Sequence, residues 1–353
     1  MRYGIKTLLL IFTFITLIGC SRLPFSSKTG KLHTIAFYNV EKLFDTTNEP
    51  GTNDDAFTPN GEMNWTQEKY NRKIQNIASA LANIGGGEGP AIIGISEIEN
   101  QKVLQDLVNA EPLRKRGYNI IHHDMPDEQG LDVALLYKPK VFKVSQQQPV
   151  KIDYGRSNYT SRDILKVQGE LQGQPVTLFV NHWPPRTRTR RGLQDDSRLR
   201  AAATTLRKEI NALQAADKDA KIIVMGDFDA EPKTNVMQQV LKATGRPNPY
   251  YNEELFNTFF MHYVNGLGSY YSRGDFKMLD QILISKSLID GEGLEYVRGS
   301  AQIHDPEELK FLYGKYKNTP LSTFSGSTYF GGYSDHFPVY IKVRKAKRNK
   351  PAI

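Results

Sequence analysis

Short apolar segments rich in β-branched residues alternate along this chain with amphipathic helical segments. The segments predicted as β-strands are His33–Tyr38, Ala91–Ile95, Val133–Tyr137, Val176–Val180, Ile222–Met225, Ile282–Ile284 and Val339–Val343. The segments predicted as helices are Gln67–Asn83, Lys102–Asn109 and Ser197–Leu213, the last with Ser197 as its N-cap. Because strands that alternate with helices typically pack as a sheet covered by helices, the pattern predicts one α/β domain over residues 31–344.

The first residues are predicted to be a secretion signal rather than part of the fold. Arg2 and Lys6 precede an apolar run over residues 8–18, which is too short to span a bilayer comfortably. Leu17-Ile18-Gly19-Cys20 resembles a bacterial lipobox, and Cys20 is the single cysteine, so no intramolecular disulfide can form. We therefore expect a lipoprotein signal peptide at residues 1–19 and a lipidated Cys20 that anchors the chain to a membrane. The alternative is a plain signal peptide followed by a chance cysteine.

This anchor sets our expectations for the ends of the chain and for its compartment. Residues 20–30 form a short tether between the lipid and the domain, and residues 345–353 form a basic, solvated tail. We expect a monomer in the bacterial cell envelope, facing the periplasm or the cell surface. The 46 Lys and Arg exceed the 38 Asp and Glu, giving a net charge of +8 that favours polyanionic partners but says nothing about the fold.

Polar side chains stand at the ends of the predicted strands. Some follow a strand and others precede one: Asn39, Glu97, Asn181-His182, Asp227, Asp280 and Asp335-His336. If the last two strands run antiparallel to the others, all of these side chains meet on one rim of the sheets. A rim of Asp, Glu, Asn and His without Cys suits a hard cation such as Mg²⁺ or Mn²⁺ better than zinc. Because close carboxylates repel one another, such a rim needs a bound cation or a shared proton.

These elements, taken in chain order, resemble the endonuclease/exonuclease/phosphatase superfamily, which has the deoxyribonuclease I-like fold. The matching elements are Tyr38-Asn39-Val40, Ser96-Glu97, Asn181-His182-Trp183, Gly226-Asp227-Phe228, Leu279-Asp280-Gln281 and Ser334-Asp335-His336. The resemblance covers the chain from about Leu32 to Val343. It implies an α/β fold, a four-layered α/β sandwich with two central mixed β-sheets flanked by helices. It also implies metal-dependent hydrolysis of a phosphoester.

The resemblance further implies roles for individual residues. Glu97 would be the principal metal ligand, with Asn39 and Asp335 completing or supporting the cation site. His336 and Asp280 would form a His–Asp dyad, in which the carboxylate orients the imidazole and raises its basicity. The imidazole would then transfer a proton or steady the phosphate.

The remaining roles concern the attacking water, the leaving oxygen and the phosphate. Asp227 would position or activate the water. His182 would act as a general acid towards the leaving oxygen, with Asp132 as a residue that orients it. Arg162 would contact the substrate phosphate, for which its guanidinium fork is suited, together with Asn181.

One residue departs from the pattern of the superfamily. The Gly-Asp-Phe element is usually followed by an Asn that donates to the phosphate, whereas an ionised Asp229 can only accept. Three explanations are open for Asp229 beside an anionic substrate. It joins a second metal site about 4 Å from the first, it reduces activity towards ordinary diesters, or burial keeps it protonated.

The substrate is less constrained by the sequence than the reaction. Residues 184–192 form a dense basic loop beside His182, continued by Arg198 and Arg200, which can clamp a nucleic-acid backbone. Three pairs of aromatic residues offer stacking faces for unpaired bases or pack in the core: Tyr250-Tyr251, Phe259-Phe260 and Tyr270-Tyr271. A nucleic acid is therefore the expected partner.

Three functions are compatible with these features. The leading one is an envelope-anchored, divalent-metal-dependent endonuclease or phosphodiesterase acting on nucleic acid. The alternatives are a phosphatase or sphingomyelinase-like lipid phosphodiesterase, and a non-catalytic binding protein that kept the fold. A further cluster, His122-His123-Asp124, looks like a metal site, but adjacent strand residues point to opposite faces, so we leave it out of the site.

Overall fold

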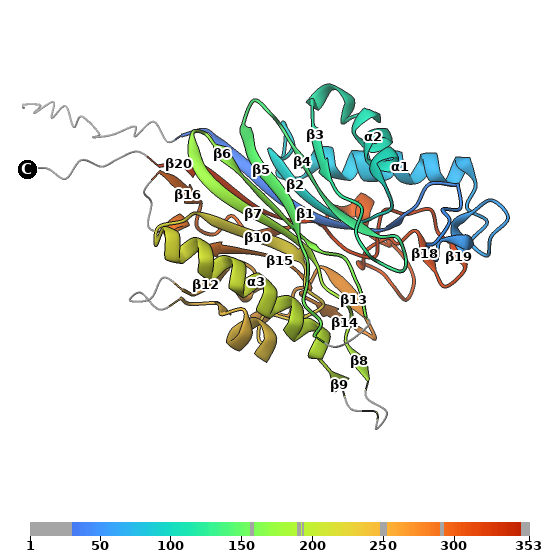
Figure 1. Ribbon diagram of the computed structural model, residues 1–353. Helices are drawn as coiled ribbons and strands as arrows, with labels where there is room; N and C mark the ends of the chain where they lie inside the picture. The colour runs from blue at the N-terminus through green and yellow to red at the C-terminus, as the bar shows by residue number, and fades with distance from the viewer. Residues whose placement is uncertain are drawn as a thin grey trace, which may run out of the picture.

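The computed structural model describes residues 30–155, 159–188, 192, 194–247, 253–289 and 293–346. Two β-sheets lie face to face at the centre of the molecule, and helices cover their outer faces (Figure 1). The predicted signal peptide, Cys20 and the end of the basic tail lie outside the described residues. Within the described ranges, no helix combines the length and the apolar character needed to cross a membrane.

The first sheet has the order β16-β20-β1-β2-β4-β3, with β17 paired to β20. Its strands are β1 (Leu32–Leu43), β2 (Ile92–Ile98), β3 (Asn119–His122), β4 (Asp132–Tyr137), β16 (Leu294–Tyr296), β17 (Gln302–Ile303) and β20 (Val339–Lys345). β1 runs parallel to β2 and antiparallel to β20.

The second sheet has the order β11-β12-β15-β10-β7-β6-β5. Its strands are β5 (Phe142–Val150), β6 (Ile164–Leu171), β7 (Gln174–His182), β10 (Ile222–Asp227), β11 (Ala243–Thr244), β12 (Leu255–Asn257) and β15 (Asp280–Ser285). β10 runs parallel to β7 and antiparallel to β15. Three two-stranded hairpins stand outside the sheets: β8 (Thr187–Arg188) with β9 (Gln194–Asp195), β13 (Tyr270–Ser272) with β14 (Asp275–Lys277), and β18 (Phe324–Ser325) with β19 (Thr328–Tyr329).

Alternation along the central strands builds the layers. In β1, Ile35 and Phe37 enter the core between the two sheets, whereas Ala36 and Tyr38 face the opposite way. That opposite face packs under α1 (Gln67–Asn83) and α2 (Gln101–Asn109). In β10 the same alternation divides side chains between the central core and α3 (Ser197–Ala216), which covers the second sheet (Figure 1). The short α4 (Phe260–Val264) follows β12. The four-layered sandwich expected from the sequence is confirmed.

The strand directions confirm that the polar clusters share one rim. The ends of β1, β2, β7 and β10 meet the beginnings of β15 and of the segment before β20, and Asp227 lies directly opposite Asp280 in register. One detail of the helix prediction is wrong. α3 extends to Ala216, and Asp196 rather than Ser197 is its N-cap residue, with no side-chain capping hydrogen bond.

A buried lysine ties α1 to this rim. Lys73 is almost fully buried on α1 and lies 3.6 Å from the carboxylate of Glu41. Its Nζ also donates to the carbonyl of Tyr333 at 2.7 Å and to the hydroxyl of Thr323. Glu41 in turn accepts the backbone N–H of Thr323 at 2.6 Å. The Lys73–Glu41 pair therefore holds the segment that leads into Asp335 and His336. Burial lowers the pKa of Lys73, and the Glu41 carboxylate opposes this shift.

We expect Lys73→Met to lower the free energy of unfolding by about 3 kcal/mol, because it leaves the Glu41 carboxylate, whose side chain is 12% exposed, without its cation. Arg72→Met, one residue away on the exposed face of α1, is the matched control and should change it by less than about 0.5 kcal/mol. Urea denaturation followed by circular dichroism measures both. Equal stability of Lys73→Met and the wild type would show that the pair does not hold this segment.

Candidate active site

The rim encloses a pocket of about 400 Å³. Many of its lining residues are those predicted from the sequence: Glu97, Arg162, His182, Asp227, Asp229, Asp335 and His336. Asn39 and Asp280 are fully buried beside it and contact residues that line it. The structure thus brings nearly all of the predicted residues to one place.

A bulge in β2 aims Glu97 at this pocket. Ser96 pairs with Val133 and Ile98 pairs with Asp132, so Glu97 is the extra residue between two ladder pairs. Its backbone is left-handed, with φ of 64°, an uncommon conformation for a residue other than glycine. Strain of this kind persists only where surrounding structure enforces it. Here the Lys42 backbone N–H donates to Oε2 of Glu97 at 2.9 Å and fixes the carboxylate.

Asn39 bridges two carboxylates. Its amide nitrogen donates to Oε1 of Glu97 at 2.9 Å and to Oδ2 of Asp227 at 3.0 Å. Its carbonyl oxygen is turned away and accepts the backbone N–H of Glu41 at 3.0 Å. In this conformation Asn39 positions the carboxylates of Glu97 and Asp227, which is a supporting role in the predicted cation site.

Asp227 stands at the end of β10, opposite Asp280. Burial raises the pKa of Asp227 to about 7, and the neighbouring Asp280 carboxylate adds to the shift. The preceding Gly226 allows the close approach of β7, because a Cβ there would lie 2.4 Å from the carbonyl oxygen of Asn181. Burial, followed by repulsion from Glu41 and Glu97, likewise raises the pKa of Asp335 to about 7. The carboxylates of the rim are therefore crowded.

His336 and Asp280 form the predicted dyad. Nδ1 of His336 lies 2.7 Å from Oδ2 of Asp280, and Nε2 lies 3.8 Å from Oδ2 of Asp227. The imidazole also stacks on Tyr270, with ring centroids 4.6 Å apart. Burial opposes protonation of His336, but the surrounding carboxylates, first that of Asp280, outweigh it and raise its pKa well above the usual value.

His182 enters the same pocket from β7. Its Nε2 lies 3.7 Å from Oε1 of Glu97 and 4.0 Å from Oδ2 of Asp227, and within the described part of the chain its Nδ1 has no partner. Burial lowers the pKa of His182 well below the usual value, helped by the charges of Arg162 and His336. The imidazole is therefore neutral, which suits hydrogen bonding better than the general-acid role predicted for it.

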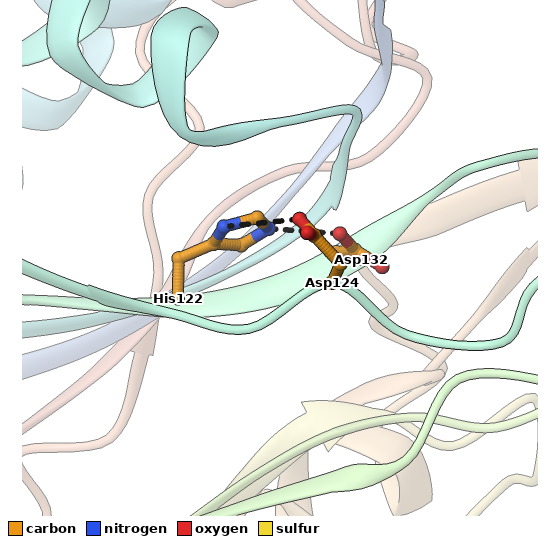
Figure 2. Close-up of side chains that lie close together, drawn as sticks. All are labelled: His122, Asp124 and Asp132. Carbon is orange, nitrogen blue, oxygen red and sulfur yellow. Dashed lines mark hydrogen bonds and ion pairs between the residues drawn. The ribbon is translucent and has the colours of Figure 1, made fainter. Parts of the chain in front are cut away.

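Asp132 does not orient His182, so that prediction is wrong. Asp132 begins β4, where its Oδ2 lies 2.8 Å from Nε2 of His122 and its Oδ1 accepts the backbone N–H of Met125 at 3.1 Å. Interactions run from the His122 ring to both Asp132 and Asp124 (Figure 2). Asp124 is 4.0 Å away and its side chain is 96% exposed, so the firm contact is the His122–Asp132 pair.

This His122–Asp132 pair fixes the connection between β3 and β4. His122, Asp124 and Asp132 place one ligand atom each within 4.8 Å of one another, but Asp124 is exposed and 4.0 Å from the ring. His123 points the other way and bonds to Gln147 on β5, as the alternation of strand side chains predicts. Burial raises the pKa of Asp132 to about 6. We interpret the pair as structural, holding the loop that carries Asp127.

Asp127 is a site residue that the sequence analysis missed. Its Oδ2 accepts a hydrogen bond from Nη1 of Arg162 at 2.8 Å, and both side chains are nearly buried. Nε of Arg162 donates to the backbone carbonyl of His182 at 3.3 Å. These two bonds hold the guanidinium at the pocket wall. No simple sequence signal marks Asp127, because it lies in a polar loop 35 residues before Arg162.

Asn181 and Asp229 differ in where they face. Asn181 is fully buried and turned away from the pocket, where its amide bonds to the Met225 carbonyl and to the Trp183 indole. It cannot touch a phosphate in the pocket, because neighbouring residues of β7 face opposite sides and His182 takes the pocket side. Asp229 does line the pocket, and its Oδ2 accepts the backbone N–H of Arg186 at 2.8 Å. Burial raises the pKa of Asp229.

A sequence profile of the endonuclease/exonuclease/phosphatase family matches residues 34–345. The chain belongs to this family. No curated protein matches the sequence. The endonuclease/exonuclease/phosphatase family includes metal-dependent phosphoesterases. The family match therefore supports metal-dependent phosphoester hydrolysis, the reaction class expected from the residues.

Solved structures share the fold. The catalytic domain of human nocturnin with bound sulfate has a TM-score of 0.54 at 17% identity, over 89% of this chain and 95% of that one. A truncated Caenorhabditis elegans TDP2 has a TM-score of 0.54 at 12% identity, over 89% and 98%. An endonuclease/exonuclease/phosphatase from Bacteroides vulgatus has a TM-score of 0.53 at 12% identity, over 89% and 99%. Identities this low establish the deoxyribonuclease I-like fold and no more.

The donor set of this family member fits a hard divalent cation. Glu97 and Asp335 both present carboxylates to the pocket, and Asp227 lies beside them. Burial is the main cause of the raised pKa values of Asp227 and Asp335, and repulsion from neighbouring carboxylates, which a cation would relieve, adds to them. Asp227, Asp280 and His336 also place ligand atoms within 4.8 Å of one another. Both Glu97 and Asp335 line the pocket, and their role as cation ligands remains a prediction.

Proposed function

We propose that this protein is a divalent-metal-dependent endonuclease that hydrolyses nucleic acid, with Mg²⁺ or Mn²⁺ as its cofactor. One observation supports hydrolysis above all others. The His336–Asp280 pair faces Asp227 across 3.8 Å, in the pocket that Glu97 enters from a strained bulge. A binding protein that had lost catalysis would not need to keep this arrangement.

Different residues of the pocket have different roles in the proposed hydrolysis of a phosphodiester. The oxygen of a water forms a bond to phosphorus as the ester P–O bond breaks; Asp227 accepts the proton of that water, and the leaving oxygen takes up a proton from solvent. His336, held by Asp280, and the neutral ring of His182 donate hydrogen bonds to the phosphate oxygens. A divalent cation held by Glu97 and Asp335 would stabilise negative charge on the reacting phosphate.

Cations beside the pocket support a polyanionic substrate. Arg198 lines the pocket, and its guanidinium stacks 3.5 Å above the ring of Tyr159. Arg186 lines the adjoining cavity together with Asp229, and Arg188 is exposed on the β8 hairpin. Residues 189–191 of the predicted basic loop lie outside the described residues. Arginines placed in this way can neutralise successive phosphates of a nucleic-acid backbone.

We also propose that Cys20 anchors the protein in the bacterial envelope. Gly30 lies against Lys345, at the beginning of β1, whereas Asn39 marks the pocket end of the same strand. The strand between Leu32 and Asn39 is about 23 Å long. The proposed anchor therefore joins the domain at the end of β1 opposite the pocket.

Nicking of supercoiled plasmid by the purified protein tests the proposal. We expect nicking with Mg²⁺ or Mn²⁺, none with EDTA, and none by His336→Ala. Intact plasmid would overturn the deoxyribonuclease assignment. RNA, bis(p-nitrophenyl) phosphate and sphingomyelin would then distinguish a ribonuclease, a general phosphodiesterase and a lipid phosphodiesterase, and inertness towards all of them would indicate a binding protein.

We expect Asp229→Asn to raise kcat/KM on a phosphodiester about tenfold, largely through a lower KM. The new amide keeps an oxygen for the Arg186 N–H and removes a negative charge beside the anionic substrate, a gain equivalent to about 1.4 kcal/mol. Asp219→Asn, an exposed substitution beyond the end of α3, is the control and should be neutral. Steady-state kinetics measure both. Loss of activity in Asp229→Asn would instead make the carboxylate essential, as a second metal ligand would be.

A further inference from the structure

A second cavity, of about 170 Å³, adjoins the catalytic pocket. The two share Tyr270 and Asp335 as lining residues, so the second cavity opens beside the place where the phosphate would bind. Its walls are predominantly aromatic: Tyr270, Tyr271, Phe311, Tyr316, Phe324 and Phe330. We refer to it as the aromatic cleft.

Two separate parts of the chain form opposite walls of the aromatic cleft. Tyr270 and Tyr271 come from β13, and Tyr270 is itself stacked on His336. The other wall comes from residues 311–330, where Phe311 packs edge-on against Phe330 with ring centroids 5.3 Å apart. Phe311 also contacts Tyr316 with ring centroids 6.0 Å apart. The rings of this wall therefore support one another.

Backbone hydrogen bonds hold the second wall in place. Phe311 donates to the Thr319 carbonyl at 3.0 Å, and Asn318 donates back to the Phe311 carbonyl at 2.7 Å. Phe330 donates to the Thr323 carbonyl at 2.9 Å. Thr323 belongs to the Glu41–Lys73 network described above. The second wall of the aromatic cleft is therefore held by backbone hydrogen bonds and is connected to the Glu41–Lys73 network, which also holds the segment leading to Asp335.

Aromatic surface is exposed around the mouth of the aromatic cleft. Tyr313 is 85% exposed, Tyr316 41% and Phe330 39%. Lys315 and Lys317 are interleaved with these rings, and Nζ of Lys315 lies 5.3 Å from the centroid of the Tyr316 ring. Grouped exposed aromatics usually mark a binding surface. Aromatic rings alternating with lysines suit a ligand that has both flat apolar faces and phosphates.

We propose that the aromatic cleft stacks an unpaired nucleobase next to the scissile phosphate and makes the enzyme selective for single-stranded nucleic acid. This inference rests on the proposed function and names its substrate class. A base within a duplex has its faces covered by its neighbours, whereas a single-stranded base can enter the cleft and stack on Tyr316 and Phe330. Sites that hold a whole drug-sized ligand measure about 300–1,000 Å³, so this smaller cleft suits a single ring system.

Cleavage of two substrates by the wild type and by one variant tests the proposal. One substrate is a single-stranded oligonucleotide with a unique cleavage site, and the other replaces the base beside that site with an abasic residue. We expect Tyr316→Ala to lower kcat/KM at least about fivefold on the first substrate and to have little effect on the second. The wild type should also cleave the single strand faster than the matched duplex. Met261→Ala, which removes an exposed apolar side chain that lines a different cavity, should behave as the wild type.

Two outcomes would overturn the inference, and they are distinguishable. If the wild type cleaves the oligonucleotide but Tyr316→Ala slows both substrates equally, the side chain has a structural role and no base occupies the cleft. If the wild type cleaves no nucleic acid yet hydrolyses bis(p-nitrophenyl) phosphate or sphingomyelin, the proposed function fails and the inference fails with it.

Discussion

Glu97→Gln is expected to lower metal-dependent hydrolysis about 10³-fold, equivalent to about 4 kcal/mol of transition-state stabilisation. The substitution keeps the shape of the side chain and an acceptor for the Lys42 N–H, but it removes the charge that attracts a cation and the acceptor for the Asn39 amide. Asp335 and Asp227 are unchanged in this variant, so the loss measures the contribution of the Glu97 carboxylate. Initial rates of nicking measured as a function of Mn²⁺ concentration test this expectation.

Glu97→Gln should also weaken the binding of the metal ion. Chelation with EDTA should reduce the wild type to the rate of Glu97→Gln, and Mn²⁺ binding measured by calorimetry should weaken in the variant. Glu62→Gln, an exposed substitution in the loop before α1, is the control for a lost surface charge. Full activity of Glu97→Gln at ordinary metal concentrations would remove Glu97 from the cation site.

The direction of the strands was predictable from the sequence, and the site follows from it. Apolar alternation in β1 and β10 assigns one face of each strand to the central core, and this places Asn39 and Asp227 at the same rim. Motif spacing then selects Glu97 and His336. The spacing does not show which way these side chains point. Glu97 reaches the pocket only through a bulge and a left-handed backbone, and no residue type in the sequence predicts either of them.

Errors arose where a side chain's direction depended on its partner. Asn181 has the residue type of a phosphate contact, but the alternation of β7 turns it towards Met225 and Trp183. Asp132 was assigned to His182, whereas the pairing of β3 with β4 brings it to His122. Long-range partners such as Asp127 for Arg162 come from loops, whose course local sequence patterns do not specify.

The aromatic cleft was beyond prediction for a related reason. Tyr270-Tyr271 were recognised as potential stacking residues, but core packing explained them equally well. Only the fold shows that Tyr270 stacks on His336 and that Phe311, Tyr316 and Phe330 face it from residues 311–330. Of the other aromatic pairs, Phe259 is a core residue, and Tyr250-Tyr251 lie outside the described residues.

The dyad is expected to act as a unit. His336→Ala should lower kcat about 10³-fold, and Asp280→Asn should lower it about 10²-fold to 10³-fold, because an amide cannot stabilise a protonated imidazole and can hold the wrong tautomer. The double variant should be little slower than His336→Ala alone, since the 2.7 Å contact with Nδ1 of His336 is the main route by which Asp280 acts on the substrate. Single-turnover rates of the three variants on one oligonucleotide give the comparison.

Independent, multiplicative losses would contradict this arrangement, because they would require Asp280 to act on the reaction by a second route. A second route is available through Asp227. Asp280 lies opposite Asp227 in register and helps to raise the pKa of Asp227, so Asp280→Asn also alters the proposed base. Asp227→Asn combined with Asp280→Asn separates the two routes, since only the path through His336 then remains. His123→Ala, on the opposite face of the β3 connection, is the control for loss of an imidazole and should leave the rate unchanged. Thermal unfolding of each variant shows whether a slow variant is also a poorly folded one.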